Sequence, residues 1–235
     1  MALPIIEVPK YSVTVPSTGD KVQYRPYLVK EEKILMIAME SESQEQMMTA
    51  VKSIIDVCTF KTLDIDRLTT FDLEYIFLKL RAKSVGEVAT VGLKCSSCSE
   101  VNEVEINLDT INVRWPEEAS KDGIVMLTDK VGIKFNYPSV KDATKMQDLE
   151  GIESIMALII SCIDNIFDAD NVYPASDSTP KEMMAFLDSL NSEQFKKIQG
   201  FFESMPNLSH ETKFACEHCE HENTLVLRGL ASFFG

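Results

Sequence analysis

Two pairs of cysteines have the residue type and the spacing of a metal site. Cys95 and Cys98 lie in the segment Lys-Cys-Ser-Ser-Cys, and Cys216 and Cys219 lie in Ala-Cys-Glu-His-Cys. Two thiolates separated by two residues can bind one face of a zinc ion, so the two pairs supply a complete tetrahedral set of ligands. Four thiolates leave no open position for water or substrate, and sites of this kind stabilise folds. We therefore predict a structural Zn²⁺ bound by all four cysteines, which would join the two halves of the chain.

Other residues near these pairs leave alternatives open. The only histidines, His210, His218 and His221, surround the second pair, and one of them could replace a cysteine as ligand. Four reduced thiols without a metal are the remaining alternative. Cys58 and Cys162 lie on apolar stripes at helical spacing and lack basic neighbours, so we expect unreactive thiols in the core.

No arrangement of residues typical of catalysis occurs in the sequence. The nine glycines form no phosphate-binding loop, and the three histidines that a Ser-His-Asp or Cys-His site would need all lie beside the cysteines. Carboxylate pairs such as Asp64 with Asp66 and Asp168 with Asp170 are expected in solvated loops of an acidic chain. We therefore predict that the protein is not an enzyme.

Charge and hydropathy argue against a nucleic-acid partner and against a membrane-spanning segment. The 235-residue chain has a formal net charge of -14, and glutamates flank both cysteine pairs, so phosphates would be repelled there and no nucleic-acid partner is expected. No apolar run approaches membrane-spanning length, and residues 155–163 are predicted to form a buried helix segment. The N-terminal sequence lacks the features of a secretory signal, which favours a reducing cytoplasm and thiolates over disulfides.

The segments around the first cysteine pair show strand and helix patterns in turn. Period-two alternation indicates strands, whereas apolar residues three and four apart indicate helices. The predicted elements are a β-hairpin at 11–28, helices at 30–39, 43–58 and 70–82, and strands at 88–93 and 103–108.

The second half of the chain repeats this order. In both halves a hairpin leads through a proline into a helix, and an asparagine follows each cysteine pair at the same offset, Asn102 and Asn223. Thr179 begins a further helix with a capping box, and Asn191 begins another helix. We predict an α+β fold of two hairpin-plus-helices halves, 1–109 and 110–235, that form one compact unit around a split four-cysteine zinc ribbon. A duplication with a pseudo-two-fold axis would explain the repeat, and chance recurrence of these elements is the alternative.

Two aromatic residues, Phe233 and Phe234, precede the final residue, Gly235. Large apolar side chains at a terminus are not exposed without a reason. Either they complete the core beneath the final strand or they bind a partner. We take both as candidate partner-binding residues.

Several segments together resemble the baseplate hub protein family of T-even-type contractile-tailed bacteriophages. They are residues 24–35, 71–87, 187–190 and 195–202, both cysteine pairs, and the ending 229–234. The resemblance covers nearly the whole chain. It implies a non-enzymatic protein that acts in assembly of the central baseplate hub through contacts with other hub proteins. It would act in the host cytoplasm during assembly or reside in the virion tail baseplate. The alternatives are a transient assembly chaperone absent from the mature virion and, less favoured, a zinc-ribbon regulatory protein.

Overall fold

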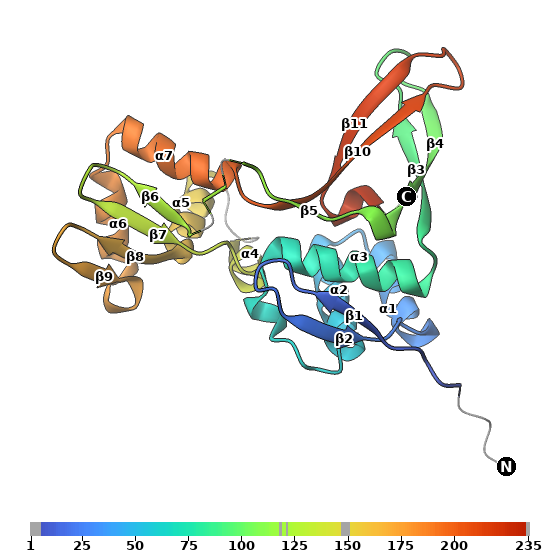
Figure 1. Cartoon of the computed structure of the whole chain (residues 1–235), viewed down its shortest axis with the longest axis horizontal. Helices are drawn as coiled ribbons and strands as arrows, with labels where there is room; N and C mark the ends of the chain where they lie inside the picture. Colours follow the sequence, from blue (N-terminus) through green and yellow to red (C-terminus); the bar gives the residue numbers. More distant parts are fainter. Residues whose placement is uncertain (1–5, 118, 121, 147–150, 234–235) are drawn as a thin grey trace. The chain divides into compact units, whose positions relative to one another are not determined.

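The computed structural model describes residues 6–117, 119–120, 122–146 and 151–233, and the chain divides into two compact units (Figure 1). Unit 1 consists of Met1–Arg114 and Asn207–Gly235, and unit 2 consists of Trp115–Pro206. Unit 2 is therefore inserted into unit 1. This division differs from the expected halves, 1–109 and 110–235, because residues 207–233 return to pack with the N-terminal part of the chain. Both cysteine pairs consequently lie in unit 1, and a shared ion would not join two halves of the fold.

The N-terminal part of unit 1 is a hairpin followed by helices. Its elements are β1 (Tyr11–Thr14), β2 (Lys21–Tyr24), α1 (Val29–Glu40), α2 (Gln44–Cys58), η1 (Ile65–Arg67) and α3 (Thr70–Ser84). Thr69 caps α3 in a capping box with Asp72, whose carboxylate also accepts the Ser17 N–H at 2.9 Å. The buried Asp72 therefore ties the hairpin turn to the start of α3.

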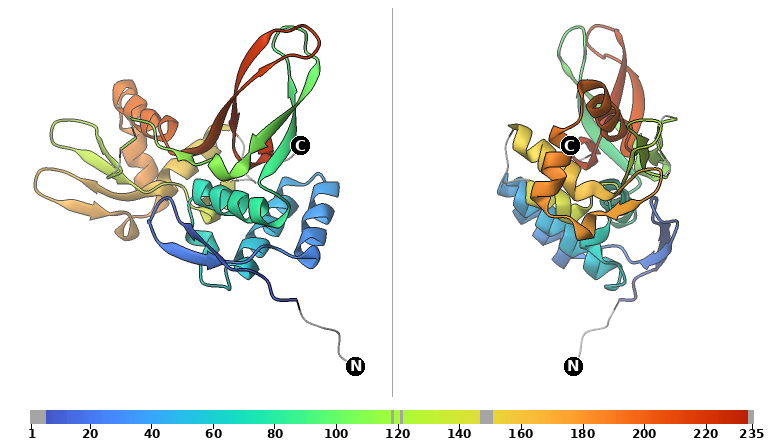
Figure 2. Two further views of the ribbon diagram at one scale, coloured as in Figure 1. Left: turned by 45° about the vertical axis from the view of Figure 1, so that its right-hand side comes forward. Right: turned by 90° about the vertical axis from the view of Figure 1, so that its left-hand side faces the viewer.

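Two longer hairpins complete unit 1. The turns at their ends lie side by side in both views of Figure 2. Their strands are β3 (Val88–Lys94), β4 (Val101–Asn107), β10 (Asn207–Ala215) and β11 (Glu222–Arg228), and β10 also pairs with the short β5 (Val113–Arg114). The segments η2 (Leu108–Thr110) and η4 (Leu230–Phe233) follow β4 and β11.

One apolar core joins these hairpins to α3, and Phe233 belongs to it. The ring is fully buried with Leu78, Ile106 and Leu208. Phe233 therefore completes the core, the first of its two predicted roles, and offers no surface to a partner in this structure. Phe234 lies outside the described residues, so its partner-binding role stays a prediction.

Among its described residues, unit 2 contains a four-stranded antiparallel sheet of order β6-β7-β8-β9 with four helices. The strands are β6 (Ile124–Met126), β7 (Gly132–Phe135), β8 (Ile163–Phe167) and β9 (Val172–Pro174), with η3 (Ala175–Asp177) after β9. The helices are α4 (Val140–Met146), α5 (Gly151–Cys162), α6 (Pro180–Asp188) and α7 (Ser192–Glu203). The predicted helix starts at Thr179 and Asn191 are confirmed, and both residues form capping boxes. Ile133 and Ile198 are fully buried in the core of this unit.

The mixed α and β composition is confirmed, whereas duplication of whole halves is not. A hairpin, a proline and a helix do recur, through Pro26 before α1 and Pro138 before α4. However, β1 and β2 form a two-stranded sheet, while β6 and β7 belong to a four-stranded one. None of the described helices has the length and apolar character needed to cross a bilayer.

Candidate metal centre

Each cysteine pair lies in the turn at the tip of a long hairpin. In the first turn the Cys95 N–H donates to the Glu100 carbonyl at 2.9 Å, and the Ser99 N–H donates to the Cys95 carbonyl at 3.0 Å. Ser99 adopts a φ of 63°, in the left-handed region, which closes the turn before β4 begins. These bonds form a compact knuckle that projects both sulfurs to one side.

The second turn has the same bonds at equivalent positions. The Cys216 N–H donates to the His221 carbonyl at 2.9 Å, and the Glu220 N–H donates to the Cys216 carbonyl at 2.9 Å. Glu220 has a φ of 58°, matching Ser99. The two knuckles are thus alike residue by residue, although their intervening residues differ in type.

All four predicted ligands come together between the hairpins. Their sulfur atoms lie within 4.8 Å of one another, with 3.8 Å between the sulfurs of Cys95 and Cys219 and 3.6 Å between those of Cys98 and Cys216. A tetrahedral zinc ion with bonds of about 2.3 Å requires sulfur separations of about 3.8 Å. The donor set therefore fits zinc.

The three histidines take no part in this cluster. Among the described residues, the one group able to hold a metal contains the four cysteines alone. Cys95 and Cys216 are buried, while Cys98 and Cys219 lie on the exposed side. The alternative of a histidine ligand thus has no support in the geometry.

Two buried asparagines cross-link the knuckles. The Asn223 side-chain oxygen accepts the N–H and the hydroxyl of Ser96, both at 2.9 Å, and the Asn102 oxygen accepts the Glu217 N–H at 2.9 Å. Each side-chain amide also donates to a carbonyl of its own hairpin, Glu100 or His221, at 3.0 Å. The sequence shows the equal offset of the asparagines, but not that each binds the opposite turn.

Backbone N–H groups donate to the cysteine sulfurs and stabilise their ionised, thiolate form. The N–H groups of Cys98 and Ser97, helped by the Asn223 amide, lower the pKa of Cys95 to about 6 despite its burial. At Cys98 the N–H of Glu100 lowers the pKa, but burial and the hydrogen bonds of the three neighbouring sulfurs raise it to about 12. The ionisation of Cys95 therefore opposes that of Cys98, because neighbouring thiolates repel one another. A divalent cation would replace the protons of thiols that bind it.

Comparison with known proteins assigns the chain to a family. A family model described as T4 bacteriophage base plate protein matches residues 8–235. No curated protein and no solved structure matches the chain. The matched range contains both hairpins of the cysteine cluster and all of unit 2. The chain belongs to the T4 bacteriophage base plate protein family.

Proposed function

We propose that the protein acts in assembly of the central baseplate hub, without catalysing a reaction, through contacts with other hub proteins. The observation that carries this proposal is the family match over residues 8–235. A baseplate is built from protein–protein contacts, so the surfaces of both units, rather than an enclosed catalytic pocket, would perform the function.

The four cysteines would support those surfaces by holding a structural zinc ion. Zinc supplies an apparent binding free energy of about 10–16 kcal/mol in small zinc-finger peptides, more than any single core contact. Since both hairpins belong to unit 1, the ion would fix the tip of one hairpin against the tip of the other. The chain's own contribution is to position the sulfurs and to donate N–H groups to them.

The carboxylate pairs Asp64 with Asp66 and Asp168 with Asp170 have structural roles. Asp64 and Asp66 are exposed and pair with Arg67 at 3.3 Å and Lys52 at 2.5 Å. Asp168 accepts the N–H of Asp170 and the N–H of Asn171, which lowers its pKa and organises a turn. Neither pair is arranged to transfer protons, which supports a non-enzymatic role.

Quantitative mass spectrometry of purified particles beside infected-cell lysate tests the proposal. Stoichiometric peptides in the particle would identify a permanent hub component. Peptides confined to the lysate would identify a transient assembly chaperone, the alternative form of this function. Normal hub assembly in a phage that lacks the chain would refute both forms. Metal analysis of the purified protein should find one zinc per chain, and metal-free protein with unchanged stability would refute the structural zinc.

A further inference from the structure

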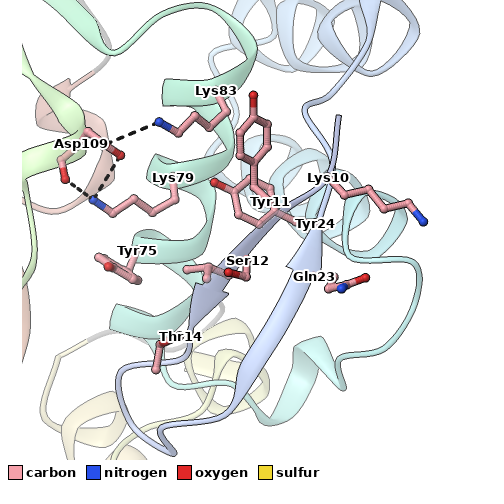
Figure 3. A pocket seen from close by; sticks show the side chains of 11 residues that line it. Lys10, Tyr11, Ser12, Thr14, Gln23, Tyr24, Tyr75, Lys79, Lys83 and Asp109 are labelled. Carbon is pink, nitrogen blue, oxygen red and sulfur yellow. Dashed lines mark hydrogen bonds and ion pairs between the residues drawn. The ribbon is translucent and has the colours of Figure 1, made fainter. Parts of the chain in front are cut away.

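A polar groove of about 670 Å³ lies within unit 1 between the strand β1 and the helix α3 (Figure 3). Ser12 and Thr14 line it from β1, and Tyr75, Lys79 and Lys83 line it from α3, with Asp109 beside the lysines. Its volume is in the range of sites that bind ligands. No part of the cysteine cluster contributes to it.

The wall formed by β1 is an open sheet edge. β1 pairs with β2 alone, and no other strand among the described ranges joins it. The backbone N–H of Val15 points towards β2, because it donates to the Asp20 carbonyl. The backbone N–H and C=O groups of Val13, two residues earlier and opposite Val22, therefore point towards β2 as well. Backbone groups alternate in direction along an antiparallel strand. The N–H and C=O groups of Ser12 and Thr14 therefore point away from β2, towards the groove.

The opposite wall has a matching length. Tyr75, Lys79 and Lys83 are four residues apart, so they lie on one face of α3 and span about 12 Å. From Tyr11 to Thr14, β1 spans about 10 Å. The groove can therefore accommodate a short extended segment parallel to both walls.

The charges around the groove favour a negatively charged occupant. The Lys79 ammonium donates to the Asp109 carbonyl at 2.6 Å and lies 3.9 Å from its carboxylate. Lys83 lies 3.5 Å from the same carboxylate and also pairs with Glu87. Asp109 and Glu87 balance these two ammonium groups, and Lys10, the third lysine of the lining, leaves one positive charge in excess around the groove, in a chain whose net charge is -14. Lys83 is the more accessible, with 22% of its side chain exposed against 10% for Lys79.

We propose that an extended segment of another baseplate protein adds to β1 as a third strand and places an Asp or Glu side chain against Lys83. The proposal rests on the function proposed above and adds the surface and the kind of partner. Backbone hydrogen bonds to Ser12 and Thr14 would supply sequence-independent affinity, and the lysines would select the acidic residue. This mode of binding uses an unpaired edge that would otherwise be open to aggregation.

A proline substitution on each edge of the hairpin tests the open edge. Thr14→Pro removes an N–H that points into the groove without removing a bond between β1 and β2. Lys21 pairs with Thr14 across the hairpin and presents its N–H to the opposite edge, so Lys21→Pro is the matched control. In cells infected by phage that lack the chain, Thr14→Pro should give at least tenfold fewer plaques than Lys21→Pro. Equal plaque numbers from two folded variants would overturn the proposal.

Photo-crosslinking provides a second measurement that does not require Thr14→Pro to fold. A full chain with p-benzoylphenylalanine at position 14 should crosslink to another baseplate protein within a segment that contains Asp or Glu. Lys83→Glu should reduce the yield at least tenfold, and Lys83→Met should reduce it less. No crosslink, a basic segment, or a second copy of this chain would each overturn the proposal.

The two proposals fail differently. If hubs form without the chain, the proposed function is refuted. If hubs require the chain but Thr14→Pro supports assembly as well as Lys21→Pro, the groove proposal alone is refuted.

Discussion

Asn223→Ala tests whether the cross-link between the knuckles stabilises the metal centre. Asn223 is 2% exposed and makes three strong hydrogen bonds, two at 2.9 Å with Ser96 and one at 3.0 Å with the His221 carbonyl. Each such bond contributes a net free energy of about 1 kcal/mol. Water can partly replace the bonds of Ser96, because that residue is exposed. We therefore expect a loss of about 2–3 kcal/mol in the free energy of unfolding.

Urea unfolding of the zinc-loaded protein measures this loss directly. The melting temperature of the transition that includes unit 1 should fall by about 4–12 °C, since a chain of this size loses about 2–4 °C for each kcal/mol. Zinc should also transfer faster to a chromophoric chelator, because the first knuckle loses its contact with the second hairpin. Asn102→Ala removes two bonds of the same kind and should cost less, about 2 kcal/mol.

Thr224→Ala, at the next residue of β11, is the matched control. Thr224 is exposed, so its truncation should change the free energy of unfolding by no more than about 0.5 kcal/mol. The reasoning would be refuted if Asn223→Ala were as stable as this control and released zinc at the same rate. In that case the sulfurs would be positioned by the turns alone.

Three further predictions concern the cysteines, the C-terminal core and an ion pair. The double substitution Cys95→Ser with Cys98→Ser should abolish zinc binding in native mass spectrometry and lower the melting temperature, and unchanged values would contradict a structural ion. Phe233→Ala should lower the free energy of unfolding by about 3–5 kcal/mol in urea, because it empties a buried core position; undiminished stability with impaired hub assembly would instead support a partner contact. Burial opposes ionisation of Glu31, but the Arg25 guanidinium and the Leu28 N–H outweigh it and lower the pKa of this carboxyl. The ionised Glu31 should therefore contribute its full stabilisation above the unfolded pKa of 4.5, and this contribution should be lost as the pH falls through the lower pKa of the folded state. Glu31→Gln should remove that part of the pH dependence of the free energy of unfolding, measured in urea.

Local signals in the sequence predicted the helices that begin at caps. Thr179 with Glu182 and Asn191 with Gln194 satisfy the first N–H groups of α6 and α7, and both partners lie within one helical turn. The apolar run 155–163 was less informative, because α5 ends at Cys162 and β8 begins at Ile163. Its strand portion is determined by pairing with β7, which the run itself does not encode.

The division into units and the groove depend on contacts between distant residues. The return of the chain to unit 1 is fixed by pairing of Leu208 with Val113, and neither residue carries a signal of its partner in the sequence. Lys79 and Lys83 have the spacing of an ordinary solvated helix face. Only the placement of β1 beside that face shows that they line a groove.

The likeness of the two knuckles does not by itself require a duplication. A tetrahedral ion bound by two Cys-x-x-Cys turns imposes an approximate two-fold relation on any two hairpins that share it. The asparagines extend this relation, since Asn102 and Asn223 bind opposite turns through equivalent atoms. The relation ends at the base of the hairpins, where β10 pairs with β5 but no described strand pairs with the outer edge of either β3 or β4. Selection for a well-ordered metal centre would therefore produce the observed symmetry whether or not the halves share an ancestor.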